Sequence, residues 1–284
     1  MAKKVLATAR DVLAACDEAL ARAPAHADAA RLVAFDADHT LWHADVGDLA
    51  WHVALAAGSF KPAAREAMAV ELRLAGGTPS GDVHADARSL YALYKEDRVT
   101  EMSIVRAMTV CYAGWTEDEV RALGARLKRE VLGAALYEGV VEIAQGLKDR
   151  GFRVVVVSGS PTWLVAEGVR GVLPLDPEKD VFGAEVLVAK GVLGATMREP
   201  ITFFEGKVDA LVQRIPGQRP SFAFGDSKGD LLLLHHAGRL AFAVNPRPQL
   251  RKVADEHERF LIFTPSRTVG GHVVRAPGTD RIIE

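Results

Sequence analysis

The hydrophobic positions of the chain follow two patterns, and each predicts a different kind of element. Continuous apolar runs, as at 32–35 and 154–157, are typical of strands that a parallel sheet buries on both faces. Apolar residues that recur every three or four positions predict helices between these runs. This alternation indicates an α/β fold with a Rossmann-like, doubly wound parallel sheet. The expected helices cover 6–22, 139–151, 205–215, 229–238 and 251–260, and another starts at Pro161. The expected strands cover 32–35, 152–160, 221–227, 239–246 and 260–263. A β-hairpin is expected over 181–198, with its turn at Lys190-Gly191.

One long stretch, residues 46–137, carries helical patterns and almost no strand signal. Five helix-forming segments follow one another there with short glycine or polar breaks. The last of them begins with a capping box, because Thr116 is followed three residues later by Glu119. We therefore expect an all-helical cap domain at 46–137, inserted into a core domain made of residues 1–45 and 138–284.

Composition and charge narrow the classes of function. The 284 residues are 49% hydrophobic and 25% charged, which suits a globular core with a smaller second domain. The net charge is −2 and no stripe of Lys and Arg is visible, so nucleic acid and anionic membranes are not expected partners. No run is long enough to span a bilayer, and the start of the chain lacks the apolar segment of a signal peptide. The two cysteines, Cys16 and Cys111, lack a metal-ligand spacing and suggest a reducing compartment. We therefore expect a cytoplasmic protein. The sequence does not determine its oligomeric state.

Two acidic residues stand where the first long strand ends. Asp36 and Asp38 directly follow the apolar run at 32–35, and side chains two positions apart lie on one face of a strand. Ligands of open α/β sheets bind beyond the carboxyl ends of the strands. One carboxylate is therefore a candidate nucleophile and the other a candidate proton donor. Alone the pattern is weak, because acidic residues after a strand also cap turns and helices.

Three later places carry polar residues in a matching order. Ser158 and Gly159 follow the apolar run at 154–157, Lys207 opens a helix, and Asp226 and Asp230 lie in GDSKGD. The segments FDADHT, VVVSGS, GK and FGDSKGD together resemble the four motifs of the haloacid dehalogenase-like superfamily. The resemblance covers roughly residues 30–250, and the helical block after the first motif resembles the cap of the phosphoserine phosphatase branch.

The resemblance implies hydrolysis of a small phosphorylated metabolite through an aspartyl phosphate on Asp36. A carboxylate near a phosphate dianion is repelled, since one pair of unit charges at ~4 Å and a dielectric near 20 costs about 4 kcal/mol. A divalent cation must offset this repulsion, and Mg²⁺ suits a site made of oxygen ligands. By analogy with the family, its ligands are the side chains of Asp36 and Asp226 and the backbone carbonyl of Asp38, with Asp230 supporting them.

The remaining motif residues have implied roles in binding and proton transfer. Lys207 would hold the phosphoryl oxygens, and Ser158 with the amide of Gly159 would bind the phosphate next to a helix start. Asp38 would protonate the leaving alkoxide and then activate water. In the family an aspartate at this place is typical of phosphatases, whereas dehalogenases lack it. Thr40 is expected to shape the turn after the first motif.

The chain departs from phosphoserine phosphatases at several positions. His39 stands where relatives carry a small residue; we expect it to point to solvent, with contact to the leaving group as the alternative. Asp45 stands where they carry a glutamate that binds the substrate's amine, and it could equally cap the next helix. Gly229 replaces an asparagine, and the place of the arginine that binds the serine carboxylate falls on Met108, with Arg106 two residues away. These departures leave the substrate open.

Two alternative functions remain at this point. Trp42 and Trp51, with other aromatic residues in and near the cap, suggest an aromatic cage for phosphocholine or phosphoethanolamine, although aromatic residues at helical spacing mostly belong to a core. A non-catalytic phosphate-binding or regulatory protein is the alternative of another class, and Gly229 and His39 keep it open. Turnover of a phosphate ester would separate it from the phosphatase.

Overall fold

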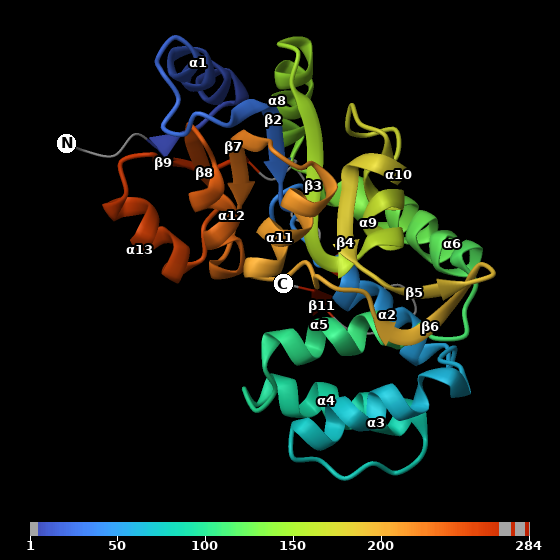
Figure 1. Ribbon diagram of the computed structural model, residues 1–284. Helices are drawn as coiled ribbons and strands as arrows, with labels where there is room; N and C mark the ends of the chain where they lie inside the picture. Colours follow the sequence, from blue (N-terminus) through green and yellow to red (C-terminus); the bar gives the residue numbers. More distant parts are fainter. Residues whose placement is uncertain (1–4, 267–273, 276–281, 284) are drawn as a thin grey trace.

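The computed structural model describes residues 5–266, 274–275 and 282–283. Within them, the main sheet has seven strands in the order β1-β9-β8-β7-β2-β3-β4 (Figure 1), and every neighbouring pair is parallel. The predicted α/β fold with a doubly wound parallel sheet is confirmed. The strands are β1 (Val5–Leu6), β2 (Ala29–Phe35), β3 (Arg153–Pro161), β4 (Val181–Ala184), β7 (Arg219–Gly225), β8 (Leu240–Val244) and β9 (Phe260–Phe263).

Helices cover both faces of this sheet, so the strands are buried on two sides. On β2, Val33 and Phe35 pack into one core cluster with α1 (Ala9–Leu20), α8 (Glu138–Asp149) and α9 (Thr162–Val169). Leu32 and Ala34 pack into a second cluster with α11 (Glu205–Arg214), α12 (Leu231–His236) and α13 (Pro248–Glu256). This two-sided burial explains why the strands read as continuous apolar runs.

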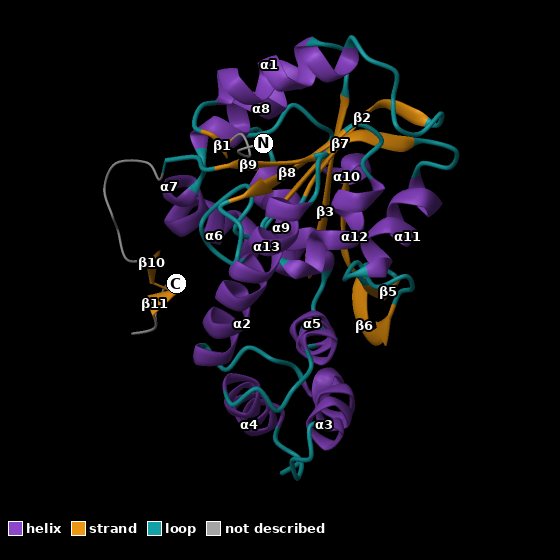
Figure 2. Cartoon of the chain, turned by 90° about the vertical axis from the view of Figure 1, so that its left-hand side faces the viewer, coloured by secondary structure: helices purple, strands orange, loops and turns teal. Residues whose placement is uncertain are grey.

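The helical block lies between β2 and β3 in sequence. Figure 1 and Figure 2 show α3, α4 and α5 grouped at one end of the molecule, beyond the sheet. The capping box of Thr116 and Glu119 is present at the start of α6, which packs against the core helix α9. The elements are α2 (Val46–Ala56), the 3₁₀ turn η1 (Pro62–Ala64), α3 (Arg65–Leu74), α4 (Val83–Lys95), α5 (Glu101–Val110), α6 (Glu117–Leu127), the π-helical turn η2 (Lys128–Leu132) and α7 (Gly133–Ala135).

Two expectations about strands need correction. The segment 181–198 is not one hairpin, because β4 joins the main sheet beside β3 and only β5 (Val186–Ala189) and β6 (Val192–Met197) pair antiparallel. The start of the chain contains the short strand β1, and the first helix begins only at Ala9, where Thr8 forms a capping box. Two residues are too few to show a strand period, so the pattern missed β1.

The remaining elements are short. They are α10 (Pro177–Asp180), the 3₁₀ turn η3 (Lys228–Asp230), and the antiparallel pair β10 (Val274–Arg275) and β11 (Ile282–Ile283). The rest of the glycine- and proline-rich tail expected from sequence lies outside the described residues. Among the described helices, none is both long and apolar enough to cross a membrane.

Candidate active site

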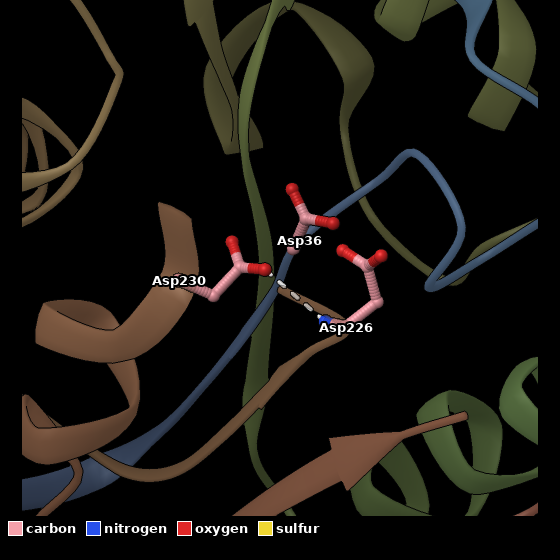
Figure 3. A group of neighbouring side chains, drawn as sticks. All are labelled: Asp36, Asp226 and Asp230. Atoms are coloured by element: carbon pink, nitrogen blue, oxygen red, sulfur yellow. Dashed lines mark hydrogen bonds between the residues drawn. The ribbon is translucent and has the colours of Figure 1, made fainter. Parts of the chain in front are cut away.

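Three buried carboxylates meet at the carboxyl edge of the sheet. Asp36 follows β2 and Asp226 follows β7, and these strands are neighbours in parallel register with Phe35 opposite Phe224. Asp230 ends η3 and turns back, so its Oδ2 accepts from the backbone N–H of Asp226 at 3.1 Å (Figure 3). Carboxylate oxygens of the three aspartates lie within 4.8 Å of one another. The sheet therefore unites acids that are about 190 residues apart in sequence.

Lys207 is the cation of this cluster. Its Nζ donates to Asp36 Oδ1 and to Asp230 Oδ1, each at 2.6 Å, and the residue is 4% exposed. The preceding Gly206 makes this position possible, because a Cβ there would lie 1.7 Å from the carbonyl oxygen of Ile201. A side chain at 206 would push α11, and with it the ammonium group, away from the acids.

The charges of the cluster do not balance without a further cation. Burial and the charge of Asp230 raise the pKa of Asp36 to about 7, although Lys207 lowers it. Burial and the charges of Asp230 and Asp36 raise the pKa of Asp226 to about 8. Burial opposes the charged form of Lys207, yet Asp230 and Asp36 together raise its pKa above the ordinary range. The ammonium of Lys207 and the guanidinium of Arg247, which bonds to Asp226 at 3.0 Å, face three carboxylates. A bound divalent cation would therefore replace protons here.

The donor set fits a hard divalent cation such as Mg²⁺, because all three groups offer oxygen. The two oxygens of Asp230 are already used, one by Lys207 and the other by backbone amides and the hydroxyl of Ser227. Asp36 and Asp226 retain more free lone pairs, since Asp36 accepts one bond on each oxygen. The residues present are therefore suited to hold the metal mainly through Asp36 and Asp226.

Asp38 is held by four donors from three directions. Its Oδ1 accepts from Trp42 Nε1 at 2.9 Å and from the backbone N–H of Val46 at 2.8 Å. Its Oδ2 accepts from Ser160 Oγ at 2.7 Å and more weakly from Ser158 Oγ at 3.4 Å. This network fixes the carboxylate beside Asp36, as a proton carrier requires.

The end of β3 brings Ser158, Gly159 and Ser160 to the site. Ser158 is wholly buried, and its hydroxyl accepts from the backbone N–H of Ser160 at 3.1 Å. Gly159 and Ser160 line the cavity described next. A Cβ at Gly159 would contact the ring of Phe203 at 3.4 Å, so a larger residue would crowd this wall. Sequence reasoning missed Ser160 because the motif assigned phosphate binding to Ser158 and Gly159 alone.

A cavity of about 850 Å³ opens from the carboxylates toward the helical block. Its lining from the block includes Tyr91, Tyr94, Ile104 and Met108, and Asp45 lines it at the junction with the core. Its lining from the core includes Asp36, Asp38, His39, Lys207, Asp226, Gly229 and Arg247. The cavity therefore joins the polar cluster to a mixed apolar and acidic region, as expected for a site that holds a small molecule by both ends.

The profile of the haloacid dehalogenase-like hydrolases matches residues 33–235, a span that includes the acids, Lys207 and the helical block. The chain belongs to the haloacid dehalogenase-like hydrolase family. The phosphoserine phosphatase of Idiomarina loihiensis is 33% identical to it over 122 residues, which are 41% of this chain and 53% of that protein. The alignment thus spans about half the length of this curated relative.

Solved structures show the same fold as this haloacid dehalogenase-like chain. A functionally unknown protein from Anaerococcus prevotii has a TM-score of 0.63 at 17% identity, with 95% of this chain and 98% of that one covered. A substrate-bound phosphoserine phosphatase has a TM-score of 0.50 at 20% identity, with 84% and 94% covered. The predicted membership of the superfamily and the likeness to phosphoserine phosphatases are confirmed.

The structure of this family member places His39 in the cavity lining and both Trp42 and Trp51 outside it. His39 does not simply point to solvent: it lines the cavity, has a φ of 60°, and burial, with Arg247 nearby, lowers its pKa to about 4. Trp42 and Trp51 are fully buried and do not belong to the cavity lining, so they cannot form a substrate cage. On α5, Met108 lines the cavity, whereas Arg106 is not among the lining residues described.

Asp45 has the capping role that the sequence left as one option. Its Oδ1 accepts from the backbone N–H of Asp48 at 2.8 Å at the start of α2. Burial and the charges of Asp38 and Asp48 raise its pKa well above the ordinary value. It also lines the cavity, so binding of a substrate amine stays a prediction. Thr40 takes part in the turn after the first motif, because its backbone N–H donates to the carbonyl of Ala37 at 3.2 Å. Its hydroxyl also donates to Asp36 Oδ2 at 2.9 Å.

Arg247 is a second residue of the site, besides Ser160, that sequence reasoning missed. It follows β8 and its Nε donates to Asp226 Oδ2 at 3.0 Å. The signal was present, because β8 ends at the same edge of the sheet as β2 and β7. None of the four motifs includes residues at the end of β8.

Lys207→Met tests the electrostatics of the cluster. Removing one partner of a buried charge cluster costs about 3–5 kcal/mol, and here it leaves the carboxylates of Asp36 and Asp230 without their shared ammonium. We expect this loss of unfolding free energy at pH 8 and a smaller loss at pH 5.5, where Asp36 can hold a proton. Urea unfolding of metal-free protein measures both values.

The matched control is Lys252→Met on the exposed face of α13. It should change the free energy of unfolding by less than about 0.5 kcal/mol. If Lys207→Met unfolds at the same urea concentration as the wild-type protein at both pH values, the ammonium does not compensate the acids.

Proposed function

We propose that this protein is a Mg²⁺-dependent phosphatase that hydrolyses a small-molecule phosphomonoester through an aspartyl-phosphate intermediate, similar to phosphoserine phosphatases. The observation that carries the proposal is the placement of Asp36 and Lys207 in a buried contact of 2.6 Å, with Asp38 also lining the same cavity. A nucleophile, a fixed positive charge and a proton carrier thus converge on one space. The membership of the family supports hydrolase chemistry.

Each residue has a defined part in the proposed reaction. Asp36 attacks phosphorus and forms an acyl phosphate, while Lys207 stabilises the charge on the phosphoryl oxygens. Asp38 protonates the leaving alkoxide and then takes a proton from the attacking water. A bound Mg²⁺ would neutralise phosphate charge and so lower the repulsion between substrate and acids. We also propose that the segment 46–137 acts as a cap over the core of 1–45 and 138–284 and excludes water during the first transfer.

Release of phosphate from para-nitrophenyl phosphate tests this function. The purified protein should release phosphate with Mg²⁺ present and lose this activity after chelation of the metal, with recovery when Mg²⁺ is restored. A control incubation with chelator saturated by Mg²⁺ should keep full activity. Absence of turnover on this ester and on a panel of phosphorylated metabolites would favour a non-catalytic phosphate-binding protein instead.

Metal binding should depend steeply on pH. In the folded metal-free protein the pKa values of Asp36 and Asp226 are raised to about 7 and about 8, so both acids hold protons below those values. Their protonation supports the fold at low pH, and that contribution is lost as the pH rises from about 4 toward 8. Mg²⁺ binds the deprotonated acids, so its affinity should fall about 10²- to 10³-fold from pH 8.5 to pH 6.

Calorimetric titration with MgCl₂ at the two pH values measures this dependence. The rise in unfolding temperature caused by Mg²⁺ should accordingly be larger at pH 8.5. Equal affinity at both values would show that these acids do not release protons to the metal.

A phosphocholine or phosphoethanolamine phosphatase is the second candidate. The cavity brings Asp45 together with Tyr91 and Tyr94, and an acid beside aromatic rings suits a cationic group. Phosphoserine, phosphoethanolamine and phosphocholine therefore belong in the first panel of substrates.

We retain a cytoplasmic location as a proposal, which the two buried free cysteines support.

A further inference from the structure

The guanidinium of Arg247 is only partly used by the protein. Its Nε donates to Asp226 Oδ2 at 3.0 Å, and the backbone N–H of the same residue donates to the carbonyl of Asp226 at 2.9 Å. A guanidinium carries five N–H donors. Among the described residues, no acceptor is bonded to its two Nη groups, and the side chain is 58% exposed. Arg247 therefore offers two free NH₂ groups to the cavity that it lines.

The charge of Arg247 is tied to Asp226 and lines the same cavity as Asp45 and Tyr94. The two bonds to Asp226 hold the loop and one edge of the guanidinium, so little further ordering is needed on binding. The charge of Arg247 acts on Asp45 and on His39, in each case in addition to the larger effect of burial. These residues lie beyond Asp38 along the chain, next to α2. The free edge of the guanidinium thus lies on the side where the leaving group of a phosphomonoester would be held.

The other cations of the cavity are less suited to bind that part of a substrate. Lys207 is buried between Asp36 and Asp230, and Lys228 pairs with Glu101 at 3.2 Å. Lys95, exposed at the end of α4, also lines the cavity but offers a single ammonium group. Among the described lining residues, Arg247 is the only arginine. A planar guanidinium binds a carboxylate through two parallel hydrogen bonds, which an ammonium cannot do.

On the basis of the proposed phosphatase function, we propose that Arg247 binds a carboxylate on the leaving group through its free Nη groups. The substrate is then a phosphomonoester of an alcohol that carries a carboxylate. Arg247 from the core, and not an arginine of the cap, sets this specificity. A neutral or purely cationic leaving group leaves the two Nη groups without an acceptor and binds more weakly.

Two inert phosphonates test the assignment without turnover. In 2-amino-4-phosphonobutyrate and 3-aminopropylphosphonate a methylene group replaces the ester oxygen of phosphoserine and phosphoethanolamine, and the two differ only by the carboxylate. Titration calorimetry with Mg²⁺ present should show about 10- to 100-fold tighter binding of the carboxylate compound to the wild-type protein. In Arg247→Gln this ratio should fall to within about twofold of one.

Arg251→Gln, one turn further along α13 and paired with Asp255, is the matched control and should keep the wild-type ratio. The proposal is overturned if the wild-type protein does not prefer the carboxylate compound, or if Arg247→Gln weakens both compounds equally. The latter result would assign Arg247 to the phosphoryl group or to Asp226. Hydrolysis of para-nitrophenyl phosphate reports separately on the phosphatase function, so its loss or survival is distinguishable from the outcome with the phosphonates.

Discussion

Asp36→Asn should abolish phosphate release, with a loss in kcat of at least about 10⁴-fold, as expected when a covalent nucleophile is removed. The amide is nearly isosteric with the carboxylate but cannot form an acyl phosphate. Lys207 keeps its bond to Asp230 at 2.6 Å, and the Thr40 hydroxyl can rotate to suit the amide. Because burial raises the pKa of Asp36 to about 7, a neutral residue there should not lower the stability of the metal-free protein at pH 8.

Steady-state hydrolysis of para-nitrophenyl phosphate and thermal unfolding measure the two parts of this expectation. Asp209→Asn, two residues after Lys207 on the exposed side of α11, is the matched control and should retain wild-type activity. Robust turnover by folded Asp36→Asn would remove Asp36 from the role of nucleophile. A variant that is inactive because it is unfolded would be recognised by its melting curve.

Asp38→Asn should lower kcat/KM by about 10²- to 10⁴-fold for alkyl phosphates, the range expected for loss of general acid–base catalysis. The loss should be smaller for para-nitrophenyl phosphate in the first transfer, because nitrophenolate leaves without a proton. The fold should tolerate the change. The amide oxygen can accept from Trp42 and Val46, and the hydroxyl of Ser160 can reverse and accept from the amide group.

Burst-phase kinetics with the two kinds of ester separate the first transfer from the second. Asp118→Asn, exposed in the first turn of α6, controls for the removal of one acid. An equal loss in the first transfer for both leaving groups would mean that Asp38 acts through positioning and not through proton donation. An unchanged rate would remove it from the chemistry altogether.

The parts of the site that the sequence predicted are those that the sheet imposes. Asp36 and Asp226 could be placed together because the carboxyl ends of parallel strands share one edge. Lys207 could be assigned to the site because it follows Gly206 at the start of a helix, between the hairpin and GDSKGD. The predicted hairpin over 181–198 wrongly includes β4, because only one residue separates β4 from β5. β4 is wholly buried and β5 is partly exposed. An alternating pattern does not show where a chain leaves one sheet and enters another.

The parts that could not be predicted depend on which neighbour a side chain meets. From sequence, Trp42 is a candidate for the wall of the substrate cavity, yet its ring is buried and its Nε1 donates to Asp38. His39 faces the cavity because its backbone adopts a left-handed conformation at φ 60°, which no pattern of hydrophobicity reveals. Arg247 needed the position of β8 in the sheet. Such choices are made by three-dimensional packing after the strands are in place.

The bond between Asp38 and the backbone of Val46 links chemistry to motion. Val46 is the first residue of α2, where the chain leaves the core for the helical block. A rotation of α2 about this point would therefore alter the hydrogen bonding of the carboxylate, and a change in the charge of the carboxylate would in turn bias the angle of α2. With the helical block acting as the proposed cap, its opening and proton transfer to the departing alcohol would be energetically linked events. Product release would then follow from the chemical step itself.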